Sequence, residues 1–480
     1  MHICKKSINF KVLKLNIILS VLMGKVNTKY SVGQEKNLFS EVPGFFDVEK
    51  SVEISFTAPD LSSLGGLALV SKAEKSSGII SGISRCIDDW RNPDLIRHSI
   101  RDMVGQRVMQ IACGYEDADD CDTLRNDSLL KMSCGRPADG NDLCSQPTMT
   151  RLENHLGHRE LYEIGEAFID NFIKSYGNDI PAKIILDLDD SNSNVYGAQQ
   201  LSLFNQYYGE YCYMPLFIFE GYSGRMLLPI LRPGRTNKQL NVFGIIRRLV
   251  ERIRAKWPNV VITIRGDAMF CSHDMFEWAD GQRGIHYCVG LTGNRVLLNN
   301  PAVLNLLAKS RSDYDRTKES VKLYGQFLYG ANSWKAVRWV TVKVEYGPLG
   351  SNIRFIVTDR TPKNRGDSKH IYEKFYCRRG ECELWIKELK DDLHIDRMSC
   401  GKFSANQFRV FLHAAAYILL WHVRKVQLKG SEADQWTTRS LQLRILKSAV
   451  RVTTLKTKIK IEFGRDHPER CLIELALRRA

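Results

Sequence analysis

The sequence lacks the features that mark membrane, fibrous and disordered proteins. No run of uncharged apolar residues reaches the roughly 18 that a membrane-spanning helix needs. Only 14 of the 480 residues are proline, 44% are hydrophobic, and the chain has no internal repeat or low-complexity tract. A chain of this length and composition can bury a large core, so we predict a soluble globular protein of several domains.

Paired-cysteine motifs are also missing. The chain has 13 Cys, an odd number, and no two of them are separated by two residues. Scattered cysteines of this kind are typical of reduced thiols in the cytoplasm, not of a disulfide framework. Four of them gather between Cys113 and Cys144, with Cys121 and Cys134 between, but their irregular spacing does not fit the known zinc motifs.

Acidic residues are fewer than basic ones. The chain carries 69 Lys and Arg against 54 Asp and Glu, a net charge of +15. From Trp421 to the C-terminus the imbalance is stronger, with 14 Lys and Arg against 6 Asp and Glu. An excess of positive charge favours a polyanionic partner such as nucleic acid.

Residues 1–38 form an N-terminal extension that resembles an export signal only loosely. Lys5 and Lys6 precede a mostly apolar stretch, but Lys14 and Asn16 interrupt it, and no small-residue cleavage site follows. We therefore expect no export signal and consider Met23 as an alternative start.

Hydrophobic periodicity divides the rest of the chain into five segments. Residues 39–176 are predicted to be mainly helical, with one helix starting at Asn92-Pro93 and continuing through Ile111. Residues 177–300 alternate between strands and a helix. The segment 301–365 is β-rich, with a hairpin over 334–358. A long helix, about 371–392, dominates 366–400, and 401–480 is predicted to be helical and basic.

The segment 177–300 has the element order of a mixed α/β sheet. Its first strand is short, apolar and ends in several carboxylates, which suggests a buried strand that opens into a polar site. The predicted elements are a strand at 182–190, a hairpin formed by 211–220 and 225–231, a helix at 241–257, and strands at 260–264 and 285–291.

Acidic residues follow two of these strands and one later helix. Asp189 closes the first strand, Asp267 follows the fourth, and Glu383 lies on the long helix. This is the order of an RNase H-like fold, in which three acids from distant positions meet. Carboxylate oxygens suit Mg²⁺, and two such ions can activate an attacking oxygen and stabilise a leaving one in phosphodiester chemistry. We therefore predict an α/β protein with an RNase H-like core, a β-rich insertion between the second and third acids, and helical N-terminal and C-terminal regions.

The long helix carries a polar stripe. Tyr376, Arg379, Glu383 and Lys390 are separated by three, four and seven residues, which places them on one face at 3.6 residues per turn. Such a stripe can hold a metal ligand between groups that bind phosphate, because Arg offers a planar fork and Lys a point charge.

The spacing Tyr, two residues, Arg, three residues, Glu, six residues, Lys resembles the signature of DDE transposases of bacterial insertion sequences. Further stretches resemble the group named for insertion sequence 1380, and together they cover most of the chain. Three residues depart from that pattern. Ala268-Met269 stands where Ser-Gly is common, and Ser191 stands where Thr is common. The matching stretches are 114–117 with 124–127, 145–148 with 151–154, 188–191 with 196–197, and 265–270.

The resemblance implies a role for each matching residue. Asp189, Asp267 and Glu383 would be the catalytic triad and would bind two Mg²⁺ ions, for which Mn²⁺ is expected to substitute. Tyr376, Arg379 and Lys390 would contact DNA. The implied partners are double-stranded DNA, as terminal inverted repeats and as target, and further copies of the chain, at least a dimer when two ends are held together. The implied setting is the bacterial cytoplasm, in association with the nucleoid and without a membrane.

Ordinary structural explanations compete with some of these assignments. Alternation puts Asp187 and Asp189 on the same face of the strand, so either could be the first acid, although the family pattern favours Asp189. Asp267 could cap a turn, and Arg379 with Glu383 could form a simple surface ion pair.

Other polar and aromatic residues near the proposed site have simpler explanations. His273 and Asp274 are expected to cap a helix. Trp334 and Trp339 are expected to pack in the hairpin, with stacking on an unpaired base as the alternative. The segment 115–117 is expected to serve folding or end recognition.

The resulting hypothesis is a transposase that nicks element ends and uses the freed 3′-hydroxyl to attack target DNA. The rivals are a nuclease of the same fold without strand transfer, and a transposase-derived DNA-binding protein with an inactive site.

Overall fold

The computed structural model describes residues 56–235, 242–361 and 367–479. The chain divides after Pro59, and the second unit, Asp60–Ala480, contains all of the elements discussed here. The predicted N-terminal extension lies outside the described residues. None of the helices within the described ranges is both long and apolar enough to span a membrane.

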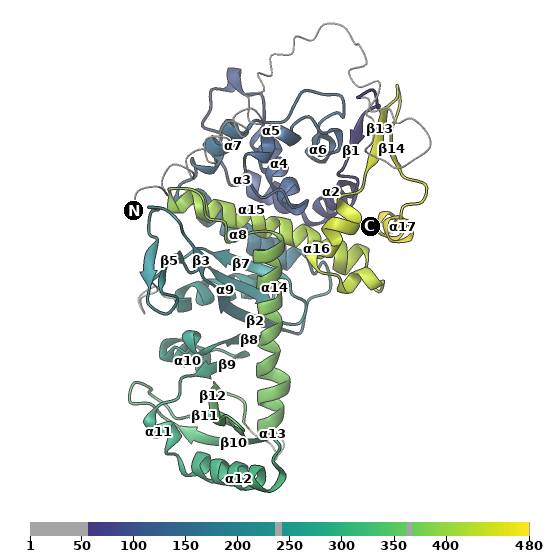
Figure 1. The fold of residues 1–480 in the computed structure, drawn as a ribbon. Coiled ribbons are helices and arrows are strands. Elements are labelled where there is room, and N and C mark those ends of the chain that lie inside the picture. The colour runs from purple at the N-terminus through teal and green to yellow at the C-terminus, as the bar shows by residue number, and fades with distance from the viewer. Residues whose placement is uncertain (1–55, 236–241, 362–366, 480) are drawn as a thin grey trace, which may run out of the picture. The chain divides into compact units, whose positions relative to one another are not determined.

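An eight-stranded mixed sheet forms the centre of this unit (Figure 1). Five of its strands lie in the order β7-β6-β2-β8-β9. Strands β2, β8 and β9 run parallel to one another, β6 runs antiparallel to β2, and β7 runs antiparallel to β6, so β6 is the one reversed strand of these five. This order and these directions are consistent with the predicted RNase H-like core. The strands are β2 (Lys183–Asp190), β6 (Leu216–Glu220), β7 (Met226–Ile230), β8 (Val261–Gly266) and β9 (Ile285–Leu291).

Strand β2 lies between β6 and β8 and is buried on both faces. Its residues from Ile184 to Asp189 are all buried, which explains why its sequence is almost continuously apolar rather than alternating. Helix α9 (Val242–Lys256) connects β7 to β8, with Ile246, Leu249 and Ile253 buried. These buried residues recur at the helical spacing that predicted a helix at 241–257, and they form its inner face.

The hairpin predicted over 211–231 is shorter than expected. Residues 211–220 do not form one strand, because the chain leaves the sheet at Met214-Pro215. The part before the proline is β5 (Glu210–Tyr213), which pairs with β3 (Ser193–Asn194) and β4 (Leu203–Asn205) in a separate three-stranded sheet. Proline has no N–H to donate to a ladder, so it commonly ends a strand. Only β6 and β7 form the hairpin.

The β-rich insertion extends the central sheet. Its helix α12 (Pro301–Thr317) is followed by β10 (Val321–Tyr329), β11 (Arg338–Gly347) and β12 (Gly350–Thr358). Strands β11 and β12 form the hairpin predicted from their alternation, and β12 pairs antiparallel with β9 at the edge of the core.

The long helix is continuous from Asp367 to Asp392 but is not uniform. It combines α13 (Asp367–Lys369) and α14 (Gly380–Lys387) with π-helical turns at His370–Tyr376 and Glu388–Asp392 and a 3₁₀ turn at Cys377–Arg379. Cys382 on its inner face is buried, and Trp385 packs against Phe219 of β6. These contacts hold the helix against the central sheet (Figure 1).

Helices gather around α15 (Phe403–His422), whose residues from Ala405 to Tyr417 are all buried. The N-terminal region is mainly helical, as predicted, but the helix expected from Asn92 to Ile111 begins later. Residues Pro93–Leu95 form only a 3₁₀ turn, and α4 (Ile100–Ala112) starts where Ser99 and Asp102 make a reciprocal capping box. The other helices here are α2 (Leu67–Ser77), α3 (Ile79–Arg85), α5 (Asp120–Leu124), α6 (Ser128–Ser133), α7 (Gln146–Glu153) and α8 (His158–Lys174).

The C-terminal region is helical in part, and the prediction of a helical region did not include its two strands. After α16 (Thr438–Leu441), the chain forms β13 (Val450–Thr454) and β14 (Ile459–Phe463), and β13 also pairs with β1 (Leu61–Ser62). The β-branched residues of 450–461 alternate with polar ones, and this period of two suits a strand whose one face is covered. The remaining helices are α10 (His273–Asp280), α11 (Arg295–Leu298) and α17 (Arg470–Arg478).

Candidate active site

Asp189 and Asp267 lie at the same end of two neighbouring strands. Strands β2 and β8 run parallel, and Leu188 of β2 is in register with Gly266 of β8, so the next residue of each chain segment is an aspartate. Asp189 is 8% exposed. The carboxylate of Asp267 accepts a hydrogen bond from the backbone N–H of Met269 at 2.8 Å, which fixes it at the start of a 3₁₀ turn.

Asp187, the alternative to Asp189, is engaged elsewhere. It is fully buried and forms a bidentate ion pair with Arg265, at 2.5 Å from Nε and 2.6 Å from Nη2. Arg265 also donates to the carbonyl of Phe375 at 2.5 Å. Gly221 leaves room for this pair, because a Cβ there would lie 2.6 Å from the Asp187 carboxylate. The pair joins β2 to β8 and to the long helix, and both carboxylate oxygens of Asp187 are taken by the guanidinium.

Glu383 is linked to Asp189 through Arg379. One guanidinium nitrogen, Nη1, lies 3.3 Å from Oδ2 of Asp189, and Nη2 lies 3.0 Å from Oε1 of Glu383. The i,i+4 pair between Arg379 and Glu383 is thus formed, but it continues to the buried strand end instead of staying on the surface. A single cation therefore neutralises two of the three acids in this conformation.

The acids interact electrostatically. Burial raises the pKa of Asp189 to about 7; Arg379 opposes this rise, and Asp267, Asp190 and Glu383 add to it. Burial is also the first cause of the raised pKa of Asp267, with Asp190 and Glu383 contributing. Four carboxylates therefore share one site, in which a negative charge is costly without a cation.

Asp190 belongs to this site through a partner that the sequence did not reveal. Its Oδ2 lies 2.6 Å from Nη2 of Arg232, whose Nε donates to the carbonyl of Met214 at 2.9 Å. Arg232 comes from the segment after β7, and no short-range pattern connects it to Asp190.

The other members of the predicted stripe also face this end of the sheet. Lys390 donates from Nζ to the carbonyl of Asn192 at 2.9 Å and to Oγ of Ser191 at 3.2 Å. Burial raises the pKa of Tyr376 to about 12. Its hydroxyl would be 3.0 Å from a Cβ at Gly290 on β9, beside the backbone of Asp267. Tyr376, Arg379 and Lys390 are thus half-buried toward this end of the sheet, whereas the side chain of Glu383 is 60% exposed.

Metal ligation requires a rearrangement of these side chains. Over the described ranges, no three His, Cys, Asp or Glu side chains are grouped closely enough to hold a metal ion. The donor chemistry nevertheless fits a hard divalent cation, since Asp189, Asp267 and Glu383 offer only carboxylate oxygens. Arg379 stands between two of these acids as a cation.

The four clustered cysteines lie in the hydrophobic core. Cys113, Cys121, Cys134 and Cys144 are buried free thiols. Burial raises the pKa of Cys113 and Cys134 to about 12 and that of Cys121 to about 11. These side chains pack among the apolar residues around them.

Two other predictions concern structural roles. The cap of helix α10 is Ser272 and not His273 or Asp274, the residues expected to cap it; these two residues form the first turn and contact each other at 2.9 Å. Trp334 packs edge-to-face against Phe276 and Tyr329, with ring centroids 5.6 and 5.5 Å apart. These contacts favour the packing interpretation of Trp334.

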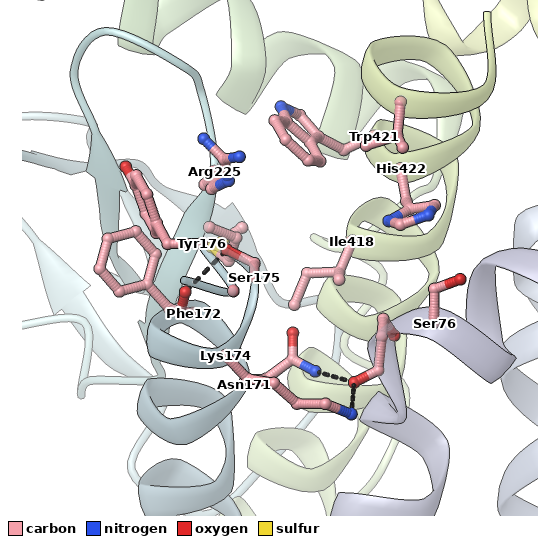
Figure 2. A pocket seen from close by; sticks show the side chains of 14 residues that line it. Ser76, Asn171, Phe172, Lys174, Ser175, Tyr176, Arg225, Ile418, Trp421 and His422 are labelled. Atoms are coloured by element: carbon pink, nitrogen blue, oxygen red, sulfur yellow. Dashed lines mark hydrogen bonds between the residues drawn. The ribbon is translucent and has the colours of Figure 1, made fainter. Parts of the chain in front are cut away.

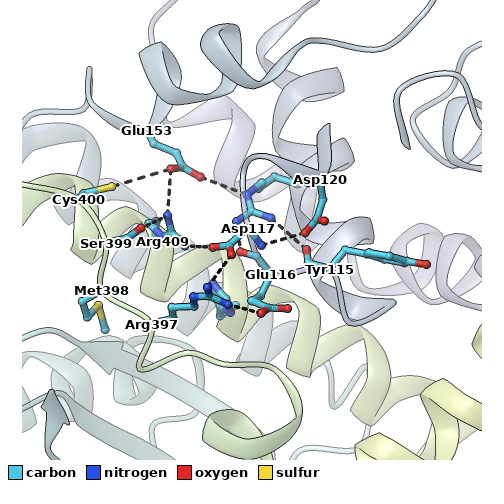
Figure 3. Close-up of polar contacts among 12 residues, drawn as sticks. Tyr115, Glu116, Asp117, Asp120, Glu153, Arg397, Met398, Ser399, Cys400 and Arg409 are labelled. Atoms are coloured by element: carbon cyan, nitrogen blue, oxygen red, sulfur yellow. Dashed lines mark hydrogen bonds and ion pairs between the residues drawn. The ribbon is translucent and has the colours of Figure 1, made fainter. Parts of the chain in front are cut away.

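The acidic motif at 115–117 forms the partly exposed side of an ion-pair network whose inner side is buried (Figure 3). Glu116 and Asp117 bind Arg397, at 2.6 and 3.0 Å, just beyond the long helix. Beneath them, Glu153 lies 3.2 Å from Nε of Arg107 and 3.7 Å from Nη1 of Arg409. Ion pairs from the N-terminal region therefore hold the segment that follows the long helix in place. These contacts favour a role of the motif in folding.

A cavity of about 310 Å³ lies apart from the acids, between α8, α15 and β7 (Figure 2). The guanidinium of Arg225 stacks between the rings of Tyr176 and Trp421, at 4.4 and 4.5 Å from their centroids. None of Asp189, Asp267 and Glu383 lines it. The cavity therefore adds nothing to the site at the strand ends.

Comparison with known proteins identifies one matching family. The family model described as Transposase DDE domain group 1 matches residues 46–480. No curated protein matches the chain. Among solved structures, the cryo-EM structure of a piggyBac transposase synaptic complex with hairpin DNA is similar, with a TM-score of 0.41 and 11% sequence identity over 79% of each chain.

Proposed function

We propose, from the premise that the chain belongs to the Transposase DDE domain group 1 family, that it cleaves DNA at the ends of a mobile element and joins the freed 3′-hydroxyl to target DNA. The finer assignment, to the insertion sequence 1380 group, rests on the motifs quoted above. A DDE transposase is a polynucleotidyl transferase, so the reaction proposed is phosphodiester hydrolysis followed by transesterification.

The observation that carries the proposal is the position of Asp189 and Asp267 at one end of two paired strands, with Glu383 joined to Asp189 through Arg379. The pairing of Asp187 with Arg265 supports Asp189 as the first acid of the triad.

In the proposed active form, Asp189, Asp267 and Glu383 would hold two Mg²⁺ ions, with Mn²⁺ as a substitute. When bound, such ions lower the pKa of water and stabilise the leaving oxygen of a phosphodiester. The raised pKa of Asp189 is consistent with a need for a cation here, because its charged form is disfavoured by burial and by neighbouring carboxylates. In this proposed form Arg379 would give up its contacts with Oδ2 of Asp189 and Oε1 of Glu383 as the ions bind.

The cationic side chains of the stripe would then bind the DNA backbone. Arg379 can exchange its two carboxylate partners for a phosphate, which accepts the same planar pair of N–H groups. Lys390 sits beside Ser191 at the mouth of the site, where it can contribute a point charge. Tyr376 is half-buried beside the backbone of Asp267 and can position a phosphate or sugar through its hydroxyl.

The C-terminal strands supply a further basic surface for double-stranded DNA. Arg451 and Lys460 share the outer face of the ribbon formed by β13 and β14, and Lys456 and Lys458 are exposed at its turn. None of the four makes an ion pair within the described part of the chain, whereas nearby Arg444 and Arg470 pair with Glu469 and Glu474. Unneutralised cations on a β-ribbon suit contact with phosphates. Holding two ends together would require at least two copies of the chain.

Cleavage of end DNA in the presence of Mg²⁺ tests the proposal. Glu383→Ala should abolish cleavage, whereas Glu381→Ala, on the same helix and paired only with Arg378 at the surface, should preserve it. Equal activity of wild type and Glu383→Ala would refute the triad.

Adding target DNA to the same reaction separates the rival functions. Joined products support a transposase, and cleavage without joining supports a nuclease. DNA binding without cleavage by the wild type supports the inactive derivative.

A further inference from the structure

A group of exposed aromatic side chains lies beside the carboxylate site. Phe204, Tyr207, Tyr208 and Tyr211, here called the aromatic platform, come from β4, β5 and the turn between them and are 46%, 88%, 39% and 59% exposed. Large aromatic side chains gathered on a surface usually mark a binding site. They have no role in the packing of the central sheet.

The platform is built to hold its rings in place. Phe204 and Tyr211 are cross-strand partners with ring centroids 5.5 Å apart, and Tyr207 stands edge-on to Tyr208 at 4.9 Å. The side chain of Asn205 accepts a hydrogen bond from the N–H of Tyr207 at 3.0 Å and donates to the carbonyl of Gly234 at 2.8 Å. Rings that are fixed before a ligand arrives lose less entropy on binding.

Close backbone contact supports the sheet beneath the platform. A Cβ at Gly234 would lie 2.0 Å from the carbonyl oxygen of Cys212, so only glycine allows this approach. On the other side, Gln199 donates to the carbonyl of Met398 at 2.7 Å, and Gln200 donates from its N–H to the carbonyl of Gly401 at 2.9 Å. The platform is thus anchored to the segment that follows the long helix.

The platform is next to the acids in space and in sequence. Strand β3 begins three residues after Asp190. Burial raises the pKa of Tyr208, and the nearby charges of Asp190 and Asp189 raise it further. A DNA strand whose phosphate reaches Asp189 can therefore extend over this surface.

The chemistry of the surface favours bases over phosphates. Residues 191–209 contain no charged side chain, although 26% of the chain is charged. The carboxylate of Glu210 is occupied by the amides of Asn192 and Asn194, at 2.7 and 2.8 Å. A neutral surface rich in Tyr and amide side chains offers rings for stacking and hydrogen-bond partners for base edges, but nothing to neutralise a phosphate.

We infer that the aromatic platform stacks on unpaired bases of the DNA strand at the cleavage site, and so forms a single-strand binding site beside the acids. The inference rests on the proposed function, because the acids bring the DNA there. Stacking on Tyr207 and Tyr208 would hold the strand end open while Lys390 and Arg379 contact its backbone.

The test measures binding without divalent metal, so that it does not depend on catalysis. The probe is a duplex of element-end DNA with a single-stranded overhang that contains 2-aminopurine, and the reference is the same DNA fully paired. The wild type should bind the overhang probe more tightly and change its fluorescence. The Tyr207→Ala/Tyr208→Ala variant should lose about tenfold in affinity for the overhang probe and little for the paired one.

Two control variants complete the test. Tyr207→Phe/Tyr208→Phe should retain the preference, since it keeps the rings, and Tyr162→Ala, on the exposed face of α8, should behave as wild type. Equal binding of both probes by the wild type, or equal losses on both probes in the Ala variant, would overturn the inference. So would a platform variant that alters only self-association in sedimentation, since the surface would then join copies of the chain. A wild type that shows the overhang preference but does not cleave end DNA with Mg²⁺ would refute the catalytic proposal alone.

Discussion

The guanidinium of Arg379 lies 3.3 Å from the carboxylate of Asp189, in the position where a cation is needed. The same side chain reaches Glu383, so that two acids from distant parts of the sequence share one internal cation. This relationship places one internal cation between two of the acids at the strand ends. In the function proposed above, Arg379 would have two kinds of partner, the acids before DNA binds and a phosphate afterwards.

Replacing Arg379 should change metal binding and cleavage in opposite directions. Arg379→Gln removes the internal cation, so we expect Mn²⁺ to bind several-fold more tightly in the absence of DNA, as measured by electron paramagnetic resonance. Cleavage of end DNA should fall because the variant has no guanidinium to bind the phosphate. Arg378→Gln is the matched control, since that residue pairs only with Glu381 at the surface. An unchanged Mn²⁺ affinity in Arg379→Gln would contradict the proposed exchange of partners.

Asp189→Asn should stabilise the metal-free protein at neutral pH. The folded-state pKa of Asp189 is about 7, above its ordinary value, so folding favours the protonated form. The stability that the protonated Asp189 side chain contributes to the folded state is fully present below the unfolded-state pKa, and it is lost as pH rises through 7. Asn mimics the protonated form, although it loses the Arg379 ion pair, and we expect a gain of roughly 1–3 kcal/mol at pH 7.5. Urea denaturation should show this gain shrinking toward pH 4; a gain that is independent of pH would contradict the assignment.

Removal of Asp187 should destabilise the protein, in contrast to the replacement of Asp189 by Asn. Both groups are fully buried, so Asp187→Ala leaves an unpaired guanidinium in the interior and should cost about 3–5 kcal/mol of folding free energy. Differential scanning calorimetry of Asp187→Ala and Asp189→Ala would separate the two aspartates. A destabilised Asp189→Ala beside an undisturbed Asp187→Ala would reverse their roles.

The ion pairs of Figure 3 should differ in strength according to burial. Arg107→Ala removes a fully buried partner of Glu153 and should cost on the order of 3–5 kcal/mol. Arg397→Ala, whose side chain is 53% exposed, should cost under about 1 kcal/mol. Chemical denaturation of the two variants measures this difference, and similar losses in both would argue against a network organised by burial.

The basic C-terminal ribbon should contribute salt-dependent DNA affinity. Lys458→Ala/Lys460→Ala removes two exposed cations without touching the buried Val450 and Val452 on the other face. The slope of log affinity against log salt should become shallower by up to about 0.9 for each phosphate that the variant no longer neutralises. Fluorescence anisotropy with duplex DNA provides the measurement; Lys309→Ala, on α12 of the insertion, is the control. An unchanged salt slope would exclude the ribbon from the DNA interface.

Local sequence patterns predicted much of the core because each depends on neighbours in the chain. The strand at 285–291 and the helix at 241–257 followed from apolar periodicity, and both are present within a residue or two. Predictions failed where competing local signals met. Pro215 ended a strand that apolar residues alone would have continued, and Ser99 started a helix that Asn92-Pro93 had suggested earlier. The strands β13 and β14 were missed because their basic residues concealed an alternation that only the partner strand makes meaningful.

The sequence by itself determined the order of the acids, the apolar strands that carry them and the polar stripe of the long helix. The sequence could not decide between Asp187 and Asp189, because alternation places both on one face of the strand. The register of β2 against β8 decides it, since it sets Arg265 opposite Asp187, where the two form an ion pair. The sequence also could not show that Arg379 lies between Asp189 and Glu383. Arg379 is 190 residues from Asp189 and four residues from Glu383. Such contacts depend on the packing of a helix against a distant strand, and that packing is set by the whole core.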